Sequence, residues 1–171
     1  MKGRGSGAGS VLAPPHRLVS VSDDEKEGKL LGPMNSITHE AEWGARPSLL
    51  LADDDPVVRS ALGAQLAGEF EVVAVAKDAA EAVELALEHQ PAAALLDVQM
   101  PKGGALEAVP GIVAGSPNTC VVILSADESR EIVLELLSAG AIAYVRKGVT
   151  GSEIAKTLGE ALKVKAGQPQ A

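Results

Sequence analysis

The sequence predicts an α/β fold in which five parallel strands alternate with five helices that cover both faces of one sheet. Three observations support this fold. Short runs of Ala, Val, Leu and Ile alternate, along residues 48–166, with longer segments whose apolar residues recur every three or four positions. The short runs are apolar throughout, which is typical of strands buried on both faces. Regular alternation of strand and helix favours parallel strands joined by right-handed crossovers.

The first expected strand is Leu49–Ala52, an apolar run that three successive aspartates end. Pro56 suits the first turn of the helix that follows, because proline there loses no helical hydrogen bond. The apolar side of this helix repeats every four residues and would pack on the sheet. It consists of Val58, Leu62 and Leu66.

The second strand is expected at Phe70–Val75. Asp78, with Glu81 three residues later, resembles a capping box and so marks the start of the second helix. We expect the buried side of this helix to consist of Val83 and Leu87.

The third strand, Ala92–Leu96, leads into Asp97, and Met100–Pro101 stops it. The third helix should lie within Ala105–Ala114. Pro110 is expected to interrupt that helix, because proline removes a hydrogen bond from a helix interior.

The remaining elements repeat the same alternation. Cys120–Leu124 and Ile142–Val145 are the fourth and fifth strands, and the fourth helix is expected from about residue 128 to residue 139. Thr150 and Glu153 form a second candidate capping box, at the start of the fifth helix. The buried residues of these two helices are expected to be Ile132, Val133, Leu136, Leu137, Ile154, Leu158 and Leu162.

The flanks of this domain differ in composition. Residues 1–47 combine a Gly/Ser-rich stretch with a mixed charge run, which predicts a disordered N-terminal tail before a domain at 48–166. Residues 167–171 form a polar C-terminal stub. The formal net charge is −8, and residues 48–171 hold all of it, with nine Lys and Arg against seventeen Asp and Glu. An acidic domain is poorly suited to direct contact with nucleic acid.

Composition excludes disulfide-linked, cysteine-metal and membrane-spanning proteins. A single cysteine, Cys120, cannot form an intramolecular disulfide or a cysteine metal cluster, which fits a cytoplasmic location. No apolar run approaches the roughly 20 residues of a membrane helix, so we expect no membrane contact.

Chemistry-bearing side chains follow four of the five expected strands. Asp53 and Asp54 follow the first, Asp97 the third, Ser125 the fourth and Lys147 the fifth. The carboxyl ends of parallel strands share one edge of a sheet, where open α/β sheets bind ligands. Crowded carboxylates raise one another's pKa, and a hard divalent cation such as Mg²⁺ relieves that repulsion. The lysine and the hydroxyl would serve a carboxylate or a bound oxyanion.

Each of these residues also has an ordinary interpretation when taken alone. The acidic run before Pro56 can simply cap a helix. Asp97 can be a turn residue, and Ser125 can cap the fourth helix. Lys147 can be a solvated surface lysine, and Tyr144 can pack against a helix. The convergence of four strand ends on one edge is what favours a functional site.

Four motifs carry a resemblance to a known family. These are LLLADDDPVVR at 49–59, LLDVQMP at 95–101, VVILSA at 121–126 and AGAIAYVRKG at 139–148. Together they resemble the receiver domain of response regulators, the CheY-like phosphoacceptor of two-component signalling. This resemblance covers about 70% of the chain. It implies a flavodoxin-like, doubly wound sheet with strand order 2-1-3-4-5.

The resemblance implies a role for each residue. Asp97 would accept a phosphoryl group from a sensor histidine kinase. The magnesium ligands would be Asp54 directly, Asp53 through water, Asp97 itself and the backbone carbonyl of Gln99. Lys147 and Ser125 would bind phosphoryl oxygens. Ser125 would then move inward and Tyr144 would follow, which would switch the face of the fourth helix, fifth strand and fifth helix.

Three departures from the family pattern stand out. Gly148 after Lys147 resembles the NarL-type subgroup. Gly103–Gly104 replaces the usual pair after Met-Pro, and Ala105 stands where the family has glycine. Ala126 beside Ser125 is small, which keeps the site open. None removes a required group. A NarL-type regulator would continue into a DNA-binding domain, so the expectation is either a stand-alone receiver or a regulator without that output domain. The expected partners are a kinase and an unknown downstream protein, with a homodimer on phosphorylation as an open option.

Two other functions compete with this one. LLLADDDPV also fits the nucleophile motif of haloacid-dehalogenase-like phosphatases, with Asp53 as nucleophile and Asp55 as general acid. That interpretation lacks a later acidic pair and leaves LLDVQMP unexplained. The second alternative is a receiver-like module that binds a protein without being phosphorylated.

Overall fold

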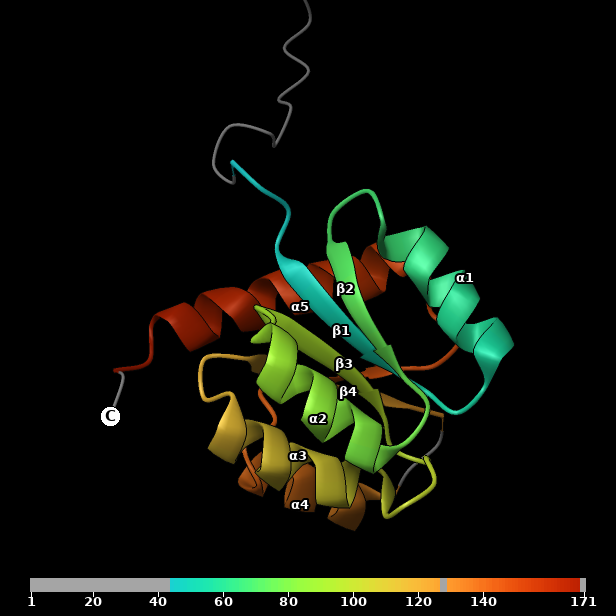
Figure 1. The fold of residues 1–171 in the computed structure, drawn as a ribbon, viewed down its shortest axis with the longest axis vertical. Helices are drawn as coiled ribbons and strands as arrows, with labels where there is room; N and C mark the ends of the chain where they lie inside the picture. The colour runs from blue at the N-terminus through green and yellow to red at the C-terminus, as the bar shows by residue number, and fades with distance from the viewer. Residues whose placement is uncertain (1–43, 127–128, 170–171) are drawn as a thin grey trace, which may run out of the picture. The chain divides into compact units, whose positions relative to one another are not determined.

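The computed structural model describes residues 44–126 and 129–169, and most of the expected tail lies outside these residues. Its five strands form one parallel sheet in the order β2-β1-β3-β4-β5, which confirms the predicted fold class (Figure 1). The strands are β1 (Ser48–Ala52), β2 (Glu71–Ala76), β3 (Ala93–Asp97), β4 (Cys120–Ser125) and β5 (Ala143–Arg146). The helices are α1 (Pro56–Leu66), α2 (Ala79–His89), α3 (Gly104–Gly115), α4 (Arg130–Ser138) and α5 (Gly151–Ala166).

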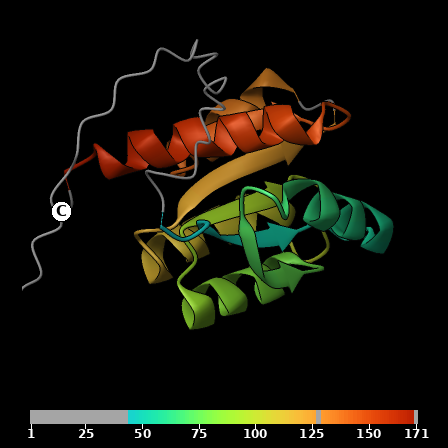
Figure 2. The ribbon, with the colours of Figure 1, turned by 90° about the horizontal axis from the view of Figure 1, so that it is seen from above.

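The sheet separates two apolar cores, because neighbouring residues of a strand face opposite sides. Leu50, Leu96 and Ile123 face a core shared with α2, α3 and α4. Leu49 and Leu95 face the other core, shared with α1 and α5. Figure 2 shows α5 on one side of the sheet and α2 on the other. Since both faces are covered, the strands are apolar throughout, as the sequence indicated.

Helix ends follow the expected capping chemistry with one difference. Thr150 and Glu153 form the predicted capping box of α5. Asp78 caps α2 by accepting from the N–H of Glu81, but the Glu81 carboxylate accepts from the N–H of Lys77 rather than from that of Asp78. The box predicted for α2 is therefore only half formed.

Two predictions about the helices were wrong. Pro110 does not interrupt α3, which runs unbroken through it. The proline cannot donate to the carbonyl of Leu106, but both residues lie on the exposed side, and burial of the opposite side outweighs that lost bond. The fully buried residues of α2 are alanines; Val83 packs partly buried against the same core, as predicted, but Leu87 is 50% exposed. Leu87 lies against Gly115 of α3, where a Cβ would come within 2.3 Å of its side chain, so it packs toward α3.

The other boundaries differ from expectation by a residue or two. The strands β2, β3 and β5 each begin and end one residue later than predicted. Helix α4 begins at Arg130 and is capped by Ser129, so the alternative that Ser125 caps it was wrong. Within the described part of the chain, no helix combines the length and the apolar character needed to cross a membrane.

Candidate functional site

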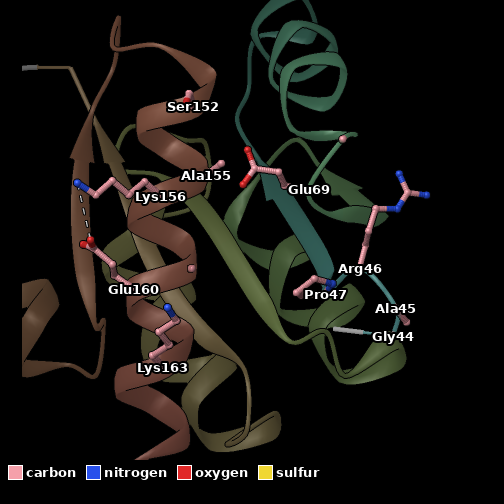
Figure 3. Close-up of a pocket in the computed structure, with 12 residues that line it drawn as sticks. Gly44, Ala45, Arg46, Pro47, Glu69, Ser152, Ala155, Lys156, Glu160 and Lys163 are labelled. Atoms are coloured by element: carbon pink, nitrogen blue, oxygen red, sulfur yellow. Dashed lines mark ion pairs between the residues drawn. The ribbon is translucent and has the colours of Figure 1, made fainter. Parts of the chain in front are cut away.

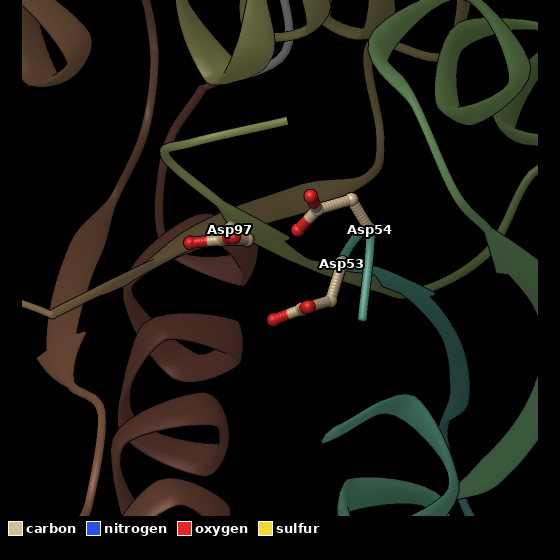
Figure 4. A group of neighbouring side chains, drawn as sticks. All are labelled: Asp53, Asp54 and Asp97. Carbon is tan, nitrogen blue, oxygen red and sulfur yellow. The ribbon is translucent and has the colours of Figure 1, made fainter. Parts of the chain in front are cut away.

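Four strand ends bring the predicted site residues to the carboxyl edge of the sheet. Asp53 and Asp54 follow β1 directly, Asp97 ends β3, Ser125 ends β4, and Lys147 follows β5. Figure 4 shows the three carboxylates gathered at this edge. Their positions follow from parallel pairing, because β1 pairs with β3, β3 with β4 and β4 with β5.

The centre of the site is an ammonium group between two buried carboxylates. The Nζ atom of Lys147 lies 2.8 Å from Oδ2 of Asp53 and 3.0 Å from Oδ2 of Asp97. Asp53 is 1% exposed and Asp97 is 4% exposed. A carboxylate buried to this degree needs a charged partner, and one lysine supplies that partner to both. The alternative that Lys147 is only a solvated surface residue was wrong.

For both Asp97 and Lys147, burial and ion pairing shift the pKa in opposite directions. Burial raises the pKa of Asp97, and the ion pair with Lys147 partly offsets that rise. Burial alone would lower the pKa of Lys147, but its hydrogen bonds to Asp53 and Asp97 raise that pKa overall. Lys147 is therefore a permanent cation at neutral pH and can hold an additional anion.

The three aspartates have the composition of a hard-cation site. Each of Asp53, Asp54 and Asp97 offers one carboxylate oxygen, and these oxygens lie within 4.8 Å of one another. Asp54 is exposed, whereas the other two are buried, so the cluster opens to solvent on the Asp54 side. Three carboxylate oxygens with access to water fit Mg²⁺, which takes oxygen ligands and retains several waters.

The backbone around Asp53 is held from three sides. Its N–H donates to the carbonyl of Ala76 at 3.1 Å, its Oδ1 accepts from the N–H of Asp55 at 2.9 Å, and Arg59 donates to its carbonyl. Asp55 in turn caps α1 by accepting from the N–H of Val57. Asp55 therefore has the helix-capping role, which does not favour the general-acid role it would need in a phosphatase. Arg59 ends the LLLADDDPVVR motif, but the motif alone does not indicate this contact.

Gln99 lies two residues beyond Asp97, between β3 and α3. Its backbone N–H interacts with the carboxylate of Asp97 and lowers the pKa of that group. The residue is exposed, and its neighbours Val98 and Met100 are buried. The loop thus turns with its apolar side chains inward and Gln99 on the side of solvent.

Ser125 and Tyr144 share a groove beside α4. The groove has a volume of about 450 Å³. Ser125 is 3% exposed, and its carbonyl accepts from the N–H of Lys147 at 2.7 Å. Tyr144 is 50% exposed and stands at the groove rather than inside it. Its other lining residues are Ala126, Arg130, Val133, Leu134, Leu137 and Arg146.

A larger hollow, of about 1120 Å³, lies along α5 (Figure 3). Its lining mixes Arg46, Lys156 and Lys163 with Glu69 and Glu160. It contains none of the residues that the sequence motifs single out, and its one ion pair, Lys156 with Glu160, spans 4.0 Å on an exposed helix face. Its charges are of mixed sign and exposed, so we do not assign chemistry to it.

Comparison with curated sequences gives a consistent result. The family model of the response regulator receiver domain matches residues 49–159. The transcriptional regulatory protein YxjL of Bacillus subtilis is 36% identical over 108 residues, which cover 61% of this chain and 49% of that protein. PdtaR of Mycobacterium tuberculosis, also a transcriptional regulatory protein, is 34% identical over 122 residues, or 71% of this chain and 59% of that protein. The chain spans about half the length of these curated relatives.

Solved structures show the same fold. The signal receiver domain of the response regulator NarL from Mycobacterium tuberculosis matches with a TM-score of 0.65 and 30% identity, over 72% of this chain and 98% of that one. The response regulator domain of CheB from Thermotoga maritima matches with a TM-score of 0.63 and 27% identity, over 73% and 100%.

Proposed function

This chain belongs to the response regulator receiver domain family, and from that premise we propose that it is a phosphoacceptor in which Asp97 is the phosphorylated residue. The observation that carries the proposal is the pairing of Lys147 with both Asp53 and Asp97, at the mouth of a cluster of three carboxylates. An ammonium held at this point offsets part of the charge of the buried carboxylates at rest and binds an anionic group when one arrives.

Phosphoryl transfer uses one oxygen of the Asp97 carboxylate as nucleophile. The oxygen attacks phosphorus while the bond to the histidine nitrogen of a sensor kinase breaks. The departing imidazole carries a proton on its other nitrogen, so the products are a neutral histidine and an acyl phosphate on Asp97. Lys147 pairs with one phosphoryl oxygen, and the Ser125 hydroxyl donates to another. Only residues at the carboxyl edge take part, and α1 to α5 serve to position them.

The acidic cluster would hold Mg²⁺ through Asp54 directly, Asp53 through water, Asp97 and the backbone carbonyl of Gln99. When bound, the ion stabilises the negative charge that spreads over the transferring phosphoryl group. The clustering of the three carboxylate oxygens supports this assignment, and burial of Asp53 beside Lys147 is consistent with an indirect role for that residue.

The switch would run from Ser125 to Tyr144. Phosphorylation draws the Ser125 hydroxyl toward the phosphoryl group and vacates the end of the groove that both residues line. Tyr144, half exposed at rest, then rotates into the groove and changes the surface formed by α4, β5 and α5. This is a two-state element that a local charge change biases.

The relatives suggest the cellular role. Because its curated relatives are regulatory proteins, we propose that this domain acts in a cytoplasmic phosphorelay between a sensor histidine kinase and a downstream protein. Its acidic charge favours a protein rather than nucleic acid as the direct partner of these residues. A homodimer formed on phosphorylation is consistent with the same surface.

Incubation with Mg²⁺ and acetyl phosphate, followed by intact mass measurement, tests the proposal. We expect a single phosphoryl group on the wild type, none on Asp97→Asn, and normal labelling of the control Glu88→Gln, whose carboxylate is exposed on α2. The acyl phosphate should also be lost with hydroxylamine, which cleaves acyl phosphates.

Two outcomes favour the alternative functions. Labelling that survives Asp97→Asn but is lost in Asp53→Asn would indicate the phosphatase-like use of Asp53. A wild type that stays unlabelled with every phosphodonor would favour a module that binds a protein without being phosphorylated.

A further inference from the structure

The loop that joins β3 to α3, residues 98–103, is held at its start, around Val98, and near its end, at Pro101; the carbonyl of Val98 also accepts from the N–H of Ala105 at 3.1 Å. The N–H of Val98 donates to the carbonyl of Leu124 at 3.1 Å, which continues the pairing of β3 with β4 by one residue. Three residues later, the carbonyl of Pro101 accepts from the N–H of Ala79 at 3.2 Å, in the first turn of α2. Gln99 lies between these two points. Release of the Pro101 contact would free the far end of the segment that carries Gln99, while the contacts of Val98 and Asp97 still hold its start.

An ion pair strengthens the second point. The Nζ atom of Lys102 lies 3.0 Å from Oδ2 of Asp78, whose side chain is only 6% exposed. The other oxygen of Asp78 accepts from the N–H of Glu81 at 2.9 Å. One buried carboxylate thus caps α2 and holds the β3–α3 loop at the same time. Hydrogen bonds from Glu81 and Lys102 lower the pKa of Asp78, so it is ionised at neutral pH.

The backbone of Lys102 needs such a restraint. Its φ is +62°, and the next two residues, Gly103 and Gly104, have φ of +92° and +59°. Glycine adopts these left-handed conformations without penalty, but a residue with a side chain does not. A Cβ on Gly104 would lie 2.2 Å from the carbonyl oxygen of Val98, so glycine is required there. Lys102 alone in this run carries the strain, and strained residues persist where surrounding contacts hold them.

We propose that Asp78 and Lys102 are positioning residues for the cation site, and that their ion pair holds the β3–α3 loop in the conformation that presents Gln99 to the cation. The proposal rests on the proposed function, because it needs the carboxylate cluster to bind Mg²⁺. Neither residue belongs to that cluster, so they act through the loop. Residues that orient a metal ligand in this way typically change metal affinity about 10–100-fold when they are removed.

The direction in which Lys102→Met changes the affinity for Mg²⁺ distinguishes a positioning role from a purely electrostatic one. Lys102→Met removes a positive charge from the neighbourhood of the cation site, and Coulomb's law alone predicts tighter binding of Mg²⁺. Loss of the ion pair predicts the opposite. In a calorimetric titration with MgCl₂ alone, we expect the dissociation constant of Lys102→Met to rise about tenfold. Lys102→Arg, which keeps a cation within reach of Asp78, should stay close to the wild type.

Asp78→Asn removes the ion-pair partner of Lys102 without removing the cap of α2. Asparagine caps helices as well as aspartate does, so Asp78→Asn keeps the contact with Glu81 and loses only the charge that attracts Lys102. If the two residues act as a pair, Asp78→Asn combined with Lys102→Met weakens Mg²⁺ binding no more than either change alone. The matched control is Lys77→Met, which removes a neighbouring exposed lysine whose charge also faces Asp78.

The outcomes are distinct. The proposal is overturned if Lys102→Met binds Mg²⁺ as tightly as the wild type or more tightly, or if Lys77→Met weakens binding equally. It is also overturned if both positioning variants melt far below the wild type without Mg²⁺, since general unfolding would then explain the loss. A wild type that binds no Mg²⁺ would instead refute the cation site itself, and with it the role of the pair.

Discussion

At the scale of single residues, Lys147 resolves a conflict in the site. Two carboxylates, Asp53 and Asp97, are buried almost completely at the edge of the sheet. Such groups are unstable as anions without a partner, yet a phosphoacceptor must be an anion to attack phosphorus. The ammonium of Lys147, at 2.8 and 3.0 Å from them, pairs with both and partly offsets the rise in the pKa of Asp97 that burial causes. Its departure from one of these carboxylates toward a phosphoryl oxygen would change the charge around β5.

Removal of this ammonium should separate phosphorylation from its structural result. With saturating Mg²⁺, which pairs with the carboxylates in place of the ammonium, we expect Lys147→Ala to accept a phosphoryl group on Asp97. We expect the α4–β5–α5 surface to stay in its resting state, because nothing then links the phosphoryl oxygen to β5. Amide chemical shifts of residues 130–166, recorded with and without beryllofluoride and Mg²⁺, measure the change. Circular dichroism checks that the variant is folded. Shift changes equal to those of the wild type would contradict this role.

Cys120 illustrates a buried residue with no role in the site. It is fully buried at the start of β4, and burial raises the pKa of its thiol to about 11. Since the thiolate is the reactive form, we expect almost no reaction with iodoacetamide at pH 8 in the folded protein. Labelling followed by mass spectrometry should show rapid reaction only in denaturing urea. Fast labelling without urea would mean that β4 opens locally.

At the scale of elements, two glycines in helices have opposite surroundings. A Cβ on Gly111 of α3 would lie 2.8 Å from Cγ2 of Val83 on α2, whereas a Cβ on Gly159 of α5 would meet no atom within 4 Å. Alanine is favoured over glycine in a helix interior by about 0.5–1 kcal/mol at either position. The two substitutions therefore differ only in packing.

We expect Gly159→Ala to stabilise the protein by about 0.5–1 kcal/mol. Gly111→Ala should destabilise it by about 1 kcal/mol or more, because overpacking against a stiff Val83 costs about 1–3 kcal/mol. Urea unfolding followed by circular dichroism measures both. Equal stabilisation by the two substitutions would mean that α2 and α3 can move apart freely.

The Asp78 cap of α2 makes the stability of the folded protein depend on pH, and the lowered pKa of Asp78 gives the direction of that dependence. The pKa of Asp78 lies below its ordinary value of 3.8, so the folded state favours the ionised form. Stability from this group is therefore complete above about pH 5 and is lost as pH falls through the folded pKa. In urea unfolding without Mg²⁺, the difference in unfolding free energy between the wild type and Asp78→Asn should be constant from pH 5 to 8. Below about pH 4 this difference should fall, and a difference that grows there would contradict the assignment.

Most elements could be predicted from the sequence, because their signals are local. Continuous apolar runs marked the strands, and a stripe with helical spacing marked α1 through Leu62 and Leu66. Predictions failed where packing between elements decides the outcome. The continuity of α3 through Pro110 depends on burial of its other side, and the exposure of Leu87 depends on how α2 packs against Gly115 of α3.

At the scale of the whole molecule, topology explains why the site residues could be grouped in advance. The carboxyl ends of parallel strands lie at the same edge of a sheet. Asp53, Asp97 and Lys147 therefore lie close together, although 94 positions separate the first from the last. The supporting contacts had no such signal. The hydrogen bond from Arg59 and the pairing of Asp78 with Lys102 depend on how loops fold back, which strand order alone does not determine.

Binding of a cation at this edge should stabilise the entire domain, because the ligands come from two adjacent strands and the loop after one of them. A ligand that binds only the folded state adds about 2.7 kcal/mol at 100 times its dissociation constant. We therefore expect saturating Mg²⁺ to raise the melting temperature of the wild type by several degrees. Asp54→Asn removes the exposed carboxylate without disturbing the Lys147 pairs, so it should abolish most of the rise, whereas Glu88→Gln on α2 should keep it. Differential scanning fluorimetry against Mg²⁺ concentration measures this effect, and an equal rise in Asp54→Asn would place the cation elsewhere on this acidic protein.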